Sequence, residues 1–174
     1  MKMILHKSMS VLAAVIAAAI ILPSVRAHAS GSSTAVRAQN VQAKIALATA
    51  RVAPGHDVGV TVDIAIEPGW HIYGNPVPED FVATSVAFDS QVIAKQQIKF
   101  PPPTPVKFEG LGQTLPVYEK SVRAAGTVMI DPKSKPGDYQ IAGTFKFQEC
   151  NDNICKIPQA VKFEIPVTVE AAAK

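Results

Sequence analysis

The sequence predicts an all-β domain, an immunoglobulin-like β-sandwich of about seven to nine strands. Two segments alternate apolar and polar residues, DVGVTVDIAIE at residues 57–67 and AVKFEIPVTVE at residues 160–170. A period of two is typical of a strand with one face against a core. After residue 29, no segment keeps a helical period for more than a turn or two, and turn-forming Pro and Gly residues separate the alternating runs. Short strands between such turns are the pattern of a sandwich.

The first 29 residues have the features of a signal peptide for secretion. Two lysines precede an unbroken apolar run over residues 11–22, and Ala-His-Ala at 27–29 is a small-x-small cleavage site before Ser30. The alternative is an uncleaved membrane anchor, which needs roughly 20 apolar residues. Since the apolar run has twelve residues and stops at Pro23, we predict export, cleavage after residue 29 and no stable membrane insertion afterwards.

Removal of the signal peptide lowers the net charge of the chain. It leaves 145 of the 174 residues, enough for one domain with a core. Three of the seventeen basic residues leave with the signal, so that fourteen basic residues face fourteen acidic ones. A nearly neutral domain gives no electrostatic case for nucleic acid or anionic lipid as a partner. Export also places the cysteines where disulfides can persist.

The elements follow in chain order. Residues 30–40, SGSSTAVRAQN, are small and polar and are expected to form a flexible lead-in. One domain is expected over residues 41–170, followed by a frayed tail at 171–174. Pro166 lies inside the last strand pattern, which predicts an edge strand with that nitrogen facing outwards. Besides the two clear strands, weaker alternation predicts strands over residues 41–47, 93–100, 122–130 and 139–147.

The only two cysteines, Cys150 and Cys155, lie in the connection between the last two predicted strands, FKFQECNDNICKIPQ at 145–159. A bond between them closes a ring of six residues. The chain-entropy gain from so small a ring is about 2 kcal/mol, against about 4.7 kcal/mol for a ring of about 100 residues. Local bridges are also prone to strain, which makes them easier to reduce. Such a pair suits exchange, while a structural staple stays open as an alternative.

Metal binding is the third possibility for the thiols. Zinc and copper sites need three or four ligands. After residue 29 the chain has only His56 and His71 as imidazoles, and neither is spaced as a partner of the cysteines. We therefore predict neither a metal nor a cofactor.

Charges beside the cysteines predict that the two thiols differ. Lys156 adjoins Cys155 and favours its thiolate, whereas Glu149 and Asp152 flank Cys150 and disfavour its ionisation. Cys155 is then the exchanging thiol. The alternative is that these are ordinary solvated loop charges, whose effect is screened.

The aromatic segment at residues 70–73 is expected to be structural. A single tryptophan in a β-sandwich, here Trp70, is usually a core residue. His71 and Tyr73 follow it, and no catalytic partner stands beside His71 in the sequence. No Ser/His/Asp order, glycine-rich phosphate loop or carboxylate pair stands out elsewhere.

The residue order of the cysteine segment resembles that of a known family. FQECNDNICKIP at 147–158 resembles the signature of the N-terminal periplasmic domain of the DsbD family of thiol–disulfide reductases: a cysteine, a short polar stretch, a second cysteine and a proline before a last strand. PGWHIYGNP at 68–76 is similar to the family's aromatic W-H-x-Y segment. LPVYEKSV at 115–122 resembles its V-Y motif. Together these matches cover roughly residues 41–170 in the family's order.

The resemblance implies a periplasmic thiol:disulfide oxidoreductase domain with an immunoglobulin-like sandwich and no cofactor. Such a domain relays electrons between a membrane-embedded thiol reductase and thioredoxin-fold proteins. By the resemblance, Cys155 forms the mixed disulfide with partners and Cys150, the deeper residue, resolves it. A cap loop covers the pair in the family, and KFEGLGQT at 107–114 occupies its place, with Phe108, Glu109 and Leu111 as candidate cap residues and Phe108 or Leu111 as the shield.

Two features keep a second function open. DsbD continues into a transmembrane region and a thioredoxin-like domain, whereas this sequence stops after the sandwich, so we expect it to borrow its electron donor. The acidic residues of the family's cap have no counterpart beyond Glu109. The alternative is a non-enzymatic, immunoglobulin-like binding module of the cell envelope, in which a structural disulfide stiffens one loop.

Overall fold

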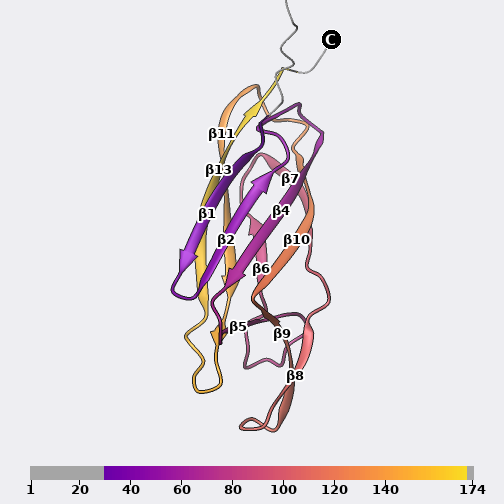
Figure 1. Ribbon diagram of the computed structural model, residues 1–174. Helices are drawn as coiled ribbons and strands as arrows, with labels where there is room; N and C mark the ends of the chain where they lie inside the picture. The colour runs from indigo at the N-terminus through magenta and orange to yellow at the C-terminus, as the bar shows by residue number, and fades with distance from the viewer. Residues whose placement is uncertain (1–29, 172–174) are drawn as a thin grey trace, which may run out of the picture.

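The computed structural model describes residues 30–171, and this part of the chain is all-β, with thirteen strands in three sheets (Figure 1). The predicted fold class is confirmed. The predicted signal peptide and the last three residues of the predicted tail lie outside the described residues. Among residues 30–171, no helix has the length and apolar character needed to cross a membrane.

Two sheets form the sandwich. The five-stranded sheet has the order β1-β2-β4-β10-β7, made of Ser32–Ala38, Val41–Leu47, Asp57–Ile66, Ser121–Ile130 and Ile93–Lys99. The four-stranded sheet has the order β3-β13-β11-β6, made of Arg51–Val52, Gln159–Val169, Gly137–Phe147 and Ser85–Phe88. These two sheets hold nine strands, the upper end of the predicted range.

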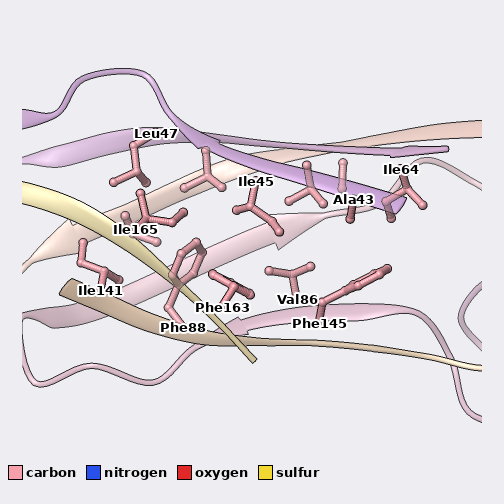
Figure 2. Close-up of a cluster of buried hydrophobic side chains, with 14 of the residues drawn as sticks. Ala43, Ile45, Leu47, Ile64, Val86, Phe88, Ile141, Phe145, Phe163 and Ile165 are labelled. Atoms are coloured by element: carbon pink, nitrogen blue, oxygen red, sulfur yellow. The ribbon is translucent and has the colours of Figure 1, made fainter. Parts of the chain in front are cut away.

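The apolar residues of the alternating strands meet between these sheets. Every second residue of β4 is buried, as its sequence period predicts. Figure 2 shows Ala43, Ile45 and Leu47 of β2 facing Phe163 and Ile165 of β13 across the core. This packing makes the sandwich a rigid base for the loops at its ends.

A third sheet lies at one end of the sandwich, where β5, β8 and β9 are seen in Figure 1. Its order is β12-β5-β9-β8, made of Glu149–Cys150, His71–Tyr73, Gln113–Glu119 and Thr104–Phe108. This sheet was not predicted. Two of its strands, β12 and β5, have only two and three residues, too few to show a period of two. It holds both the cysteine segment and the predicted cap segment.

The expectation of a flexible lead-in over residues 30–40 is wrong. Residues 32–38 form β1, which pairs with β2 along its whole length, from Ser32 opposite Leu47 to Ala38 opposite Val41. The inward residues of β1 are small, so its hydrophobic alternation is weak and the segment resembles a linker in sequence. The free edge of β2 supplies the hydrogen-bond partners that order it.

Pro166 lies in β13 opposite Gln140 of β11. On the other side of β13, β3 pairs only with Thr168 and Val169. At Pro166 the strand therefore has a ladder partner on one side alone, a position that tolerates a residue without an N–H group.

Candidate redox site

Cys150 and Cys155 are joined by a disulfide, and their exposure differs sharply. Cys150 ends β12 and is 1% exposed, whereas Cys155 is exposed to solvent. The loop between them, residues 150–155 and here called the cysteine loop, is shaped by Asn151. Its side-chain oxygen accepts hydrogen bonds from the N–H groups of Asn153 and Ile154, each at 2.9 Å. This turn places one sulfur inside the protein and leaves the other residue at the surface, the order of depth expected from the family resemblance.

Gln148 fixes the start and end of the cysteine loop. Its Oε1 accepts a hydrogen bond from the N–H of Val82 at 3.1 Å, and its Nε2 donates to the carbonyl of Lys156 at 3.2 Å. The N–H of Lys156 donates in turn to the carbonyl of Glu149 at 2.9 Å. These hydrogen bonds hold the backbone on both sides of the disulfide.

The charges next to the cysteines lie differently from the sequence expectation. Glu149 is 1% exposed and accepts a hydrogen bond from the N–H of Asn40 at 3.3 Å, so the alternative of a solvated loop charge is wrong for this residue. Successive residues of a strand point to opposite faces, so Glu149 points away from the face that carries Cys150. Lys156 Nζ lies 5.6 Å from the centroid of the ring of Trp70. Trp70 itself is half-buried and packs against the core, as expected for a structural tryptophan.

The side chain of Tyr73 contacts both sulfurs of the disulfide. Its hydroxyl donates a hydrogen bond to Sγ of Cys150 at 3.1 Å and lies 3.5 Å from Sγ of Cys155. The side chain is 1% exposed, and burial raises the pKa of the Tyr73 phenol above its ordinary value. The hydroxyl therefore stays protonated at neutral pH and serves the sulfurs as a hydrogen-bond donor. This contact could not be predicted from the sequence, because the two residues are 77 positions apart.

His71 lies on the same face of β5 as Tyr73, two residues earlier. It is 4% exposed, and its Nε2 has no hydrogen-bond partner among residues 30–171. Its ring packs 4.9 Å from that of Phe108, measured between centroids. Burial lowers the pKa of the His71 imidazole below its ordinary value, and the carboxylates of Glu119 and Asp152 oppose that shift. A buried polar atom without a partner costs about 1–3 kcal/mol, so its presence calls for an explanation.

The predicted cap is the end of a hairpin formed by β8, β9 and the turn between them, here called the cap hairpin. In its turn the N–H of Leu111 donates to the carbonyl of Phe108 at 3.0 Å, and Gly112 adopts a positive φ of 62°. Figure 1 shows this turn at the same end of the molecule as the third sheet. The hairpin and the cysteine loop together line a cleft of about 640 Å³.

The three predicted cap residues all line this cleft, but they differ in depth. Phe108 is partly buried and packs against the small cluster that contains Tyr73 and Cys150. Leu111 is 50% exposed, and Glu109 is exposed and paired with Lys107 at 2.9 Å. Phe108 is therefore the deepest of the three, while Leu111 and Glu109 form the rim of the cleft.

A larger groove, of about 790 Å³, crosses the outer face of the five-stranded sheet. It is lined mostly by aliphatic and basic residues, and its one carboxylate, Asp63, is paired with Arg123. It contains no thiol or imidazole. Within residues 30–171, no three His, Cys, Asp or Glu residues are grouped closely enough to hold a metal ion. The cleft at the disulfide is thus the candidate site.

Fold and site together define a class: an all-β sandwich domain that holds one local disulfide in a cleft, with one cysteine buried and the other exposed. Residues 37–166 match the model of the family described as thiol:disulfide interchange protein DsbD, N-terminal. The chain therefore belongs to the DsbD N-terminal domain family, as the resemblance in its sequence predicts. No curated protein sequence is similar enough to match.

One solved structure supports the fold. The N-terminal periplasmic domain of ScsB from Proteus mirabilis is similar at a TM-score of 0.55 and 16% identity, over 78% of this chain and 50% of that chain. The present chain thus spans about half the length of the ScsB domain.

Two structures from Neisseria meningitidis are also similar. One is the DsbD N-terminal domain in the reduced form, with a TM-score of 0.43 and 16% identity over 86% of this chain and 96% of that one. The other is the complex between the DsbD N-terminal and PilB N-terminal domains. Its TM-score is 0.41 and its identity 14%, over 84% of this chain and 88% of that chain.

Proposed function

We propose that the chain is a periplasmic thiol–disulfide exchange domain, which relays electrons between a membrane-embedded thiol reductase and thioredoxin-fold partners through Cys150 and Cys155. The observation that carries the proposal is the disulfide with one buried and one exposed cysteine inside a cleft. Membership of the DsbD N-terminal domain family supports thiol–disulfide exchange as its chemistry. The predicted signal peptide and the family's setting support the periplasm.

The geometry favours Cys155 as the residue that meets the partner. A donor thiolate attacks Sγ of Cys155, a bond forms between the two proteins, and Cys150 leaves as the thiolate. The Tyr73 hydroxyl, 3.1 Å from Sγ of Cys150, is placed to stabilise that leaving charge. A second donor thiol then resolves the mixed disulfide, so that two electrons pass to the pair. Delivery to an oxidised partner runs the same steps in reverse, with Cys155 attacking and Cys150 resolving.

The surface around Cys155 supports a protein partner. Three large apolar side chains are exposed in or beside this region: Leu111 at 50%, Ile154 at 50% and Ile157 at 81%. Leu111 and Ile154 both line the cleft, one from the cap hairpin and one from the cysteine loop. Exposed apolar residues that gather around a reactive group mark an interaction surface. The class of partner, a thioredoxin-fold protein, follows from the family.

In the proposed function, the cap hairpin controls access to the disulfide. Phe108 packs against the cluster around Cys150 and limits access to the sulfurs. A docking partner would displace Phe108 and cover Leu111 and Glu109 at the rim. Until a partner binds, Phe108 shields the buried Cys150, while Cys155 stays accessible.

A second function, a binding module with a structural disulfide, is favoured by the hydrogen bonds that clamp the cysteine loop at Gln148 and Lys156. The two functions differ in redox potential. Equilibrating the protein in glutathione buffers and trapping the free thiols by alkylation measures that potential. A value above about −300 mV supports exchange, and a value far below it marks a structural bond.

A further inference from the structure

Cys150, His71 and Glu119 lie in one row across three strands of the third sheet. Cys150 of β12 pairs directly with His71 of β5, and His71 pairs directly with Glu119 of β9. Residues directly opposite each other in antiparallel strands point to the same face, with Cβ atoms about 4.5–5.5 Å apart. The imidazole is therefore the neighbour of the buried thiol on one side and of a carboxylate on the other.

The environment of His71 is that of a neutral base. The ring is buried, lines the cleft together with both cysteines, and is covered by Phe108. Burial lowers its pKa, so that the imidazole is uncharged at neutral pH and has a free nitrogen lone pair to accept a proton. His56, the other imidazole in the described residues, is exposed and lies 3.1 Å from the carbonyl of Pro54 through its Nδ1.

The unpartnered Nε2 has an explanation in the redox cycle. In the disulfide form, Sγ of Cys150 is bonded to sulfur and carries no proton, so it offers the imidazole nothing to accept. Once the bond is broken, Cys150 becomes a thiol in the same row. A buried thiol in apolar surroundings does not ionise readily, so the resolving step needs a base beside it.

We infer that His71 accepts the proton of the Cys150 thiol in the step that resolves the mixed disulfide. This rests on the proposed function, since it assigns a residue to that exchange. The proton moves from Sγ of Cys150 to His71, and the thiolate attacks Sγ of Cys155. The bond between Cys155 and the partner's sulfur breaks, the 150–155 bond forms, and the partner leaves with the electron pair as a thiolate. The imidazolium returns its proton to that thiolate or to water.

Tyr73 and His71 then have different roles in the exchange. The Tyr73 phenol stays protonated and donates to the sulfur, whereas His71 takes the proton away. The titratable groups around His71 come from each neighbouring element. Cys150 on β12 and Glu119 on β9 pair with it, Tyr73 shares its face of β5, and Asp152, Lys107 and Glu109 line the same cleft from the cysteine loop and the cap hairpin. Of these groups, the carboxylates of Glu119 and Asp152 raise the pKa of His71.

A two-phase thiol titration tests the inference. The reduced full-length protein, in excess, is mixed with dithiobis(nitrobenzoate), which gives coloured nitrothiobenzoate at each step. Attack on the reagent releases the first equivalent, and resolution by the second cysteine releases the other in a phase that is independent of concentration. A Cys150→Ser variant should give the first release alone, which identifies the second phase as resolution. Absence of the second phase in the unmodified protein would count against the proposed function itself.

The His71→Gln variant is expected to slow the second phase about 100-fold at neutral pH, in the range of a lost general base, and to leave the first phase unchanged. In the unmodified protein the second phase should rise through the His71 pKa and level off. In His71→Gln it should keep rising until the thiol itself titrates. His56→Gln is the matched control and should behave like the unmodified protein. An unchanged second phase, or equal slowing of both phases with the same pH profile, overturns the inference.

Glu119→Gln gives a second test if His71→Gln does not fold. Glu119 is exposed, and its charge raises the pKa of His71. Its removal should shift the inflection of the second phase to lower pH while the first phase stays the same. An inflection that does not move overturns the assignment of His71.

Discussion

The hydroxyl of Tyr73 lies 3.1 Å from Sγ of Cys150 and 3.5 Å from Sγ of Cys155, so that one buried phenol contacts both sulfurs of the disulfide. The contact joins β5 to the cysteine loop across 77 positions of sequence. Tyr73 also belongs to the small hydrophobic cluster that holds Cys150. Tyr73 therefore contacts the reactive sulfurs and also belongs to the cluster that buries Cys150.

Removing this hydroxyl should slow reduction of the disulfide. Tyr73→Phe keeps the ring and its packing but loses the donor that stabilises the leaving Cys150 thiolate. A hydrogen bond to a charged group contributes about 1.5–3 kcal/mol, so we expect a fall of about tenfold or more in the rate of reduction by dithiothreitol. Tyr139→Phe, which removes an exposed hydroxyl bonded to the carbonyl of Lys135, is the matched control. Equal rates in Tyr73→Phe and the unmodified protein would show that the phenol does not act on the sulfurs.

Trimming the cap should expose the thiols unequally. Phe108 packs against the cluster around Cys150, whereas Leu111 is half-exposed at the rim. Phe108→Ala should raise the alkylation rate of the reduced protein more than Leu111→Ala does, and the increase should be seen at both cysteines. The rates are measured by mass spectrometry after timed quenching. If neither substitution changes the rates, the cap hairpin is not a lid.

A glycine of the sandwich offers a test of the strand register. Gly126 lies in β10 opposite Ile98 of β7. A Cβ at this position would run into the backbone oxygen of Gln97, which cannot move without breaking the ladder. Gly126→Ala should therefore lower the free energy of unfolding by about 1–3 kcal/mol or more. Denaturant unfolding measures the change.

Gly110 is the control for that substitution, since a Cβ there meets nothing within 4 Å. Gly110→Ala should leave the unfolding free energy nearly unchanged. Similar losses in the two variants would contradict the pairing of β7 with β10.

The long strands were predictable because their two faces meet different surroundings. β4 and β13 alternate over ten and eleven residues, which is enough to define a buried face. β1 was missed, since its inward residues are small and its order depends on the neighbouring edge of β2. Local hydropathy carries no information about such a partner.

Only part of the candidate site, the cysteine pair and the cap segment, was predictable from the sequence. The cysteines and the cap segment are visible as short motifs, and Phe108, Glu109 and Leu111 do line the cleft with them. The roles of Tyr73 and His71 depend on the pairing of β5 with β12, a contact of two residues between distant segments. Glu149 was misread for the same reason, because only the strand geometry turns its side chain away from Cys150.

The order in which the two cysteines act is the central claim. Cells that express the full-length chain with Cys150→Ser, Cys155→Ser or both substitutions can be compared by diagonal gels of envelope extracts. Cys150→Ser should accumulate a mixed disulfide, because the exposed Cys155 still attacks and no thiol resolves the complex. Cys155→Ser and the double variant should accumulate none. Trapping by Cys155→Ser alone would reverse the order, and trapping by neither single variant would contradict exchange and favour a structural disulfide.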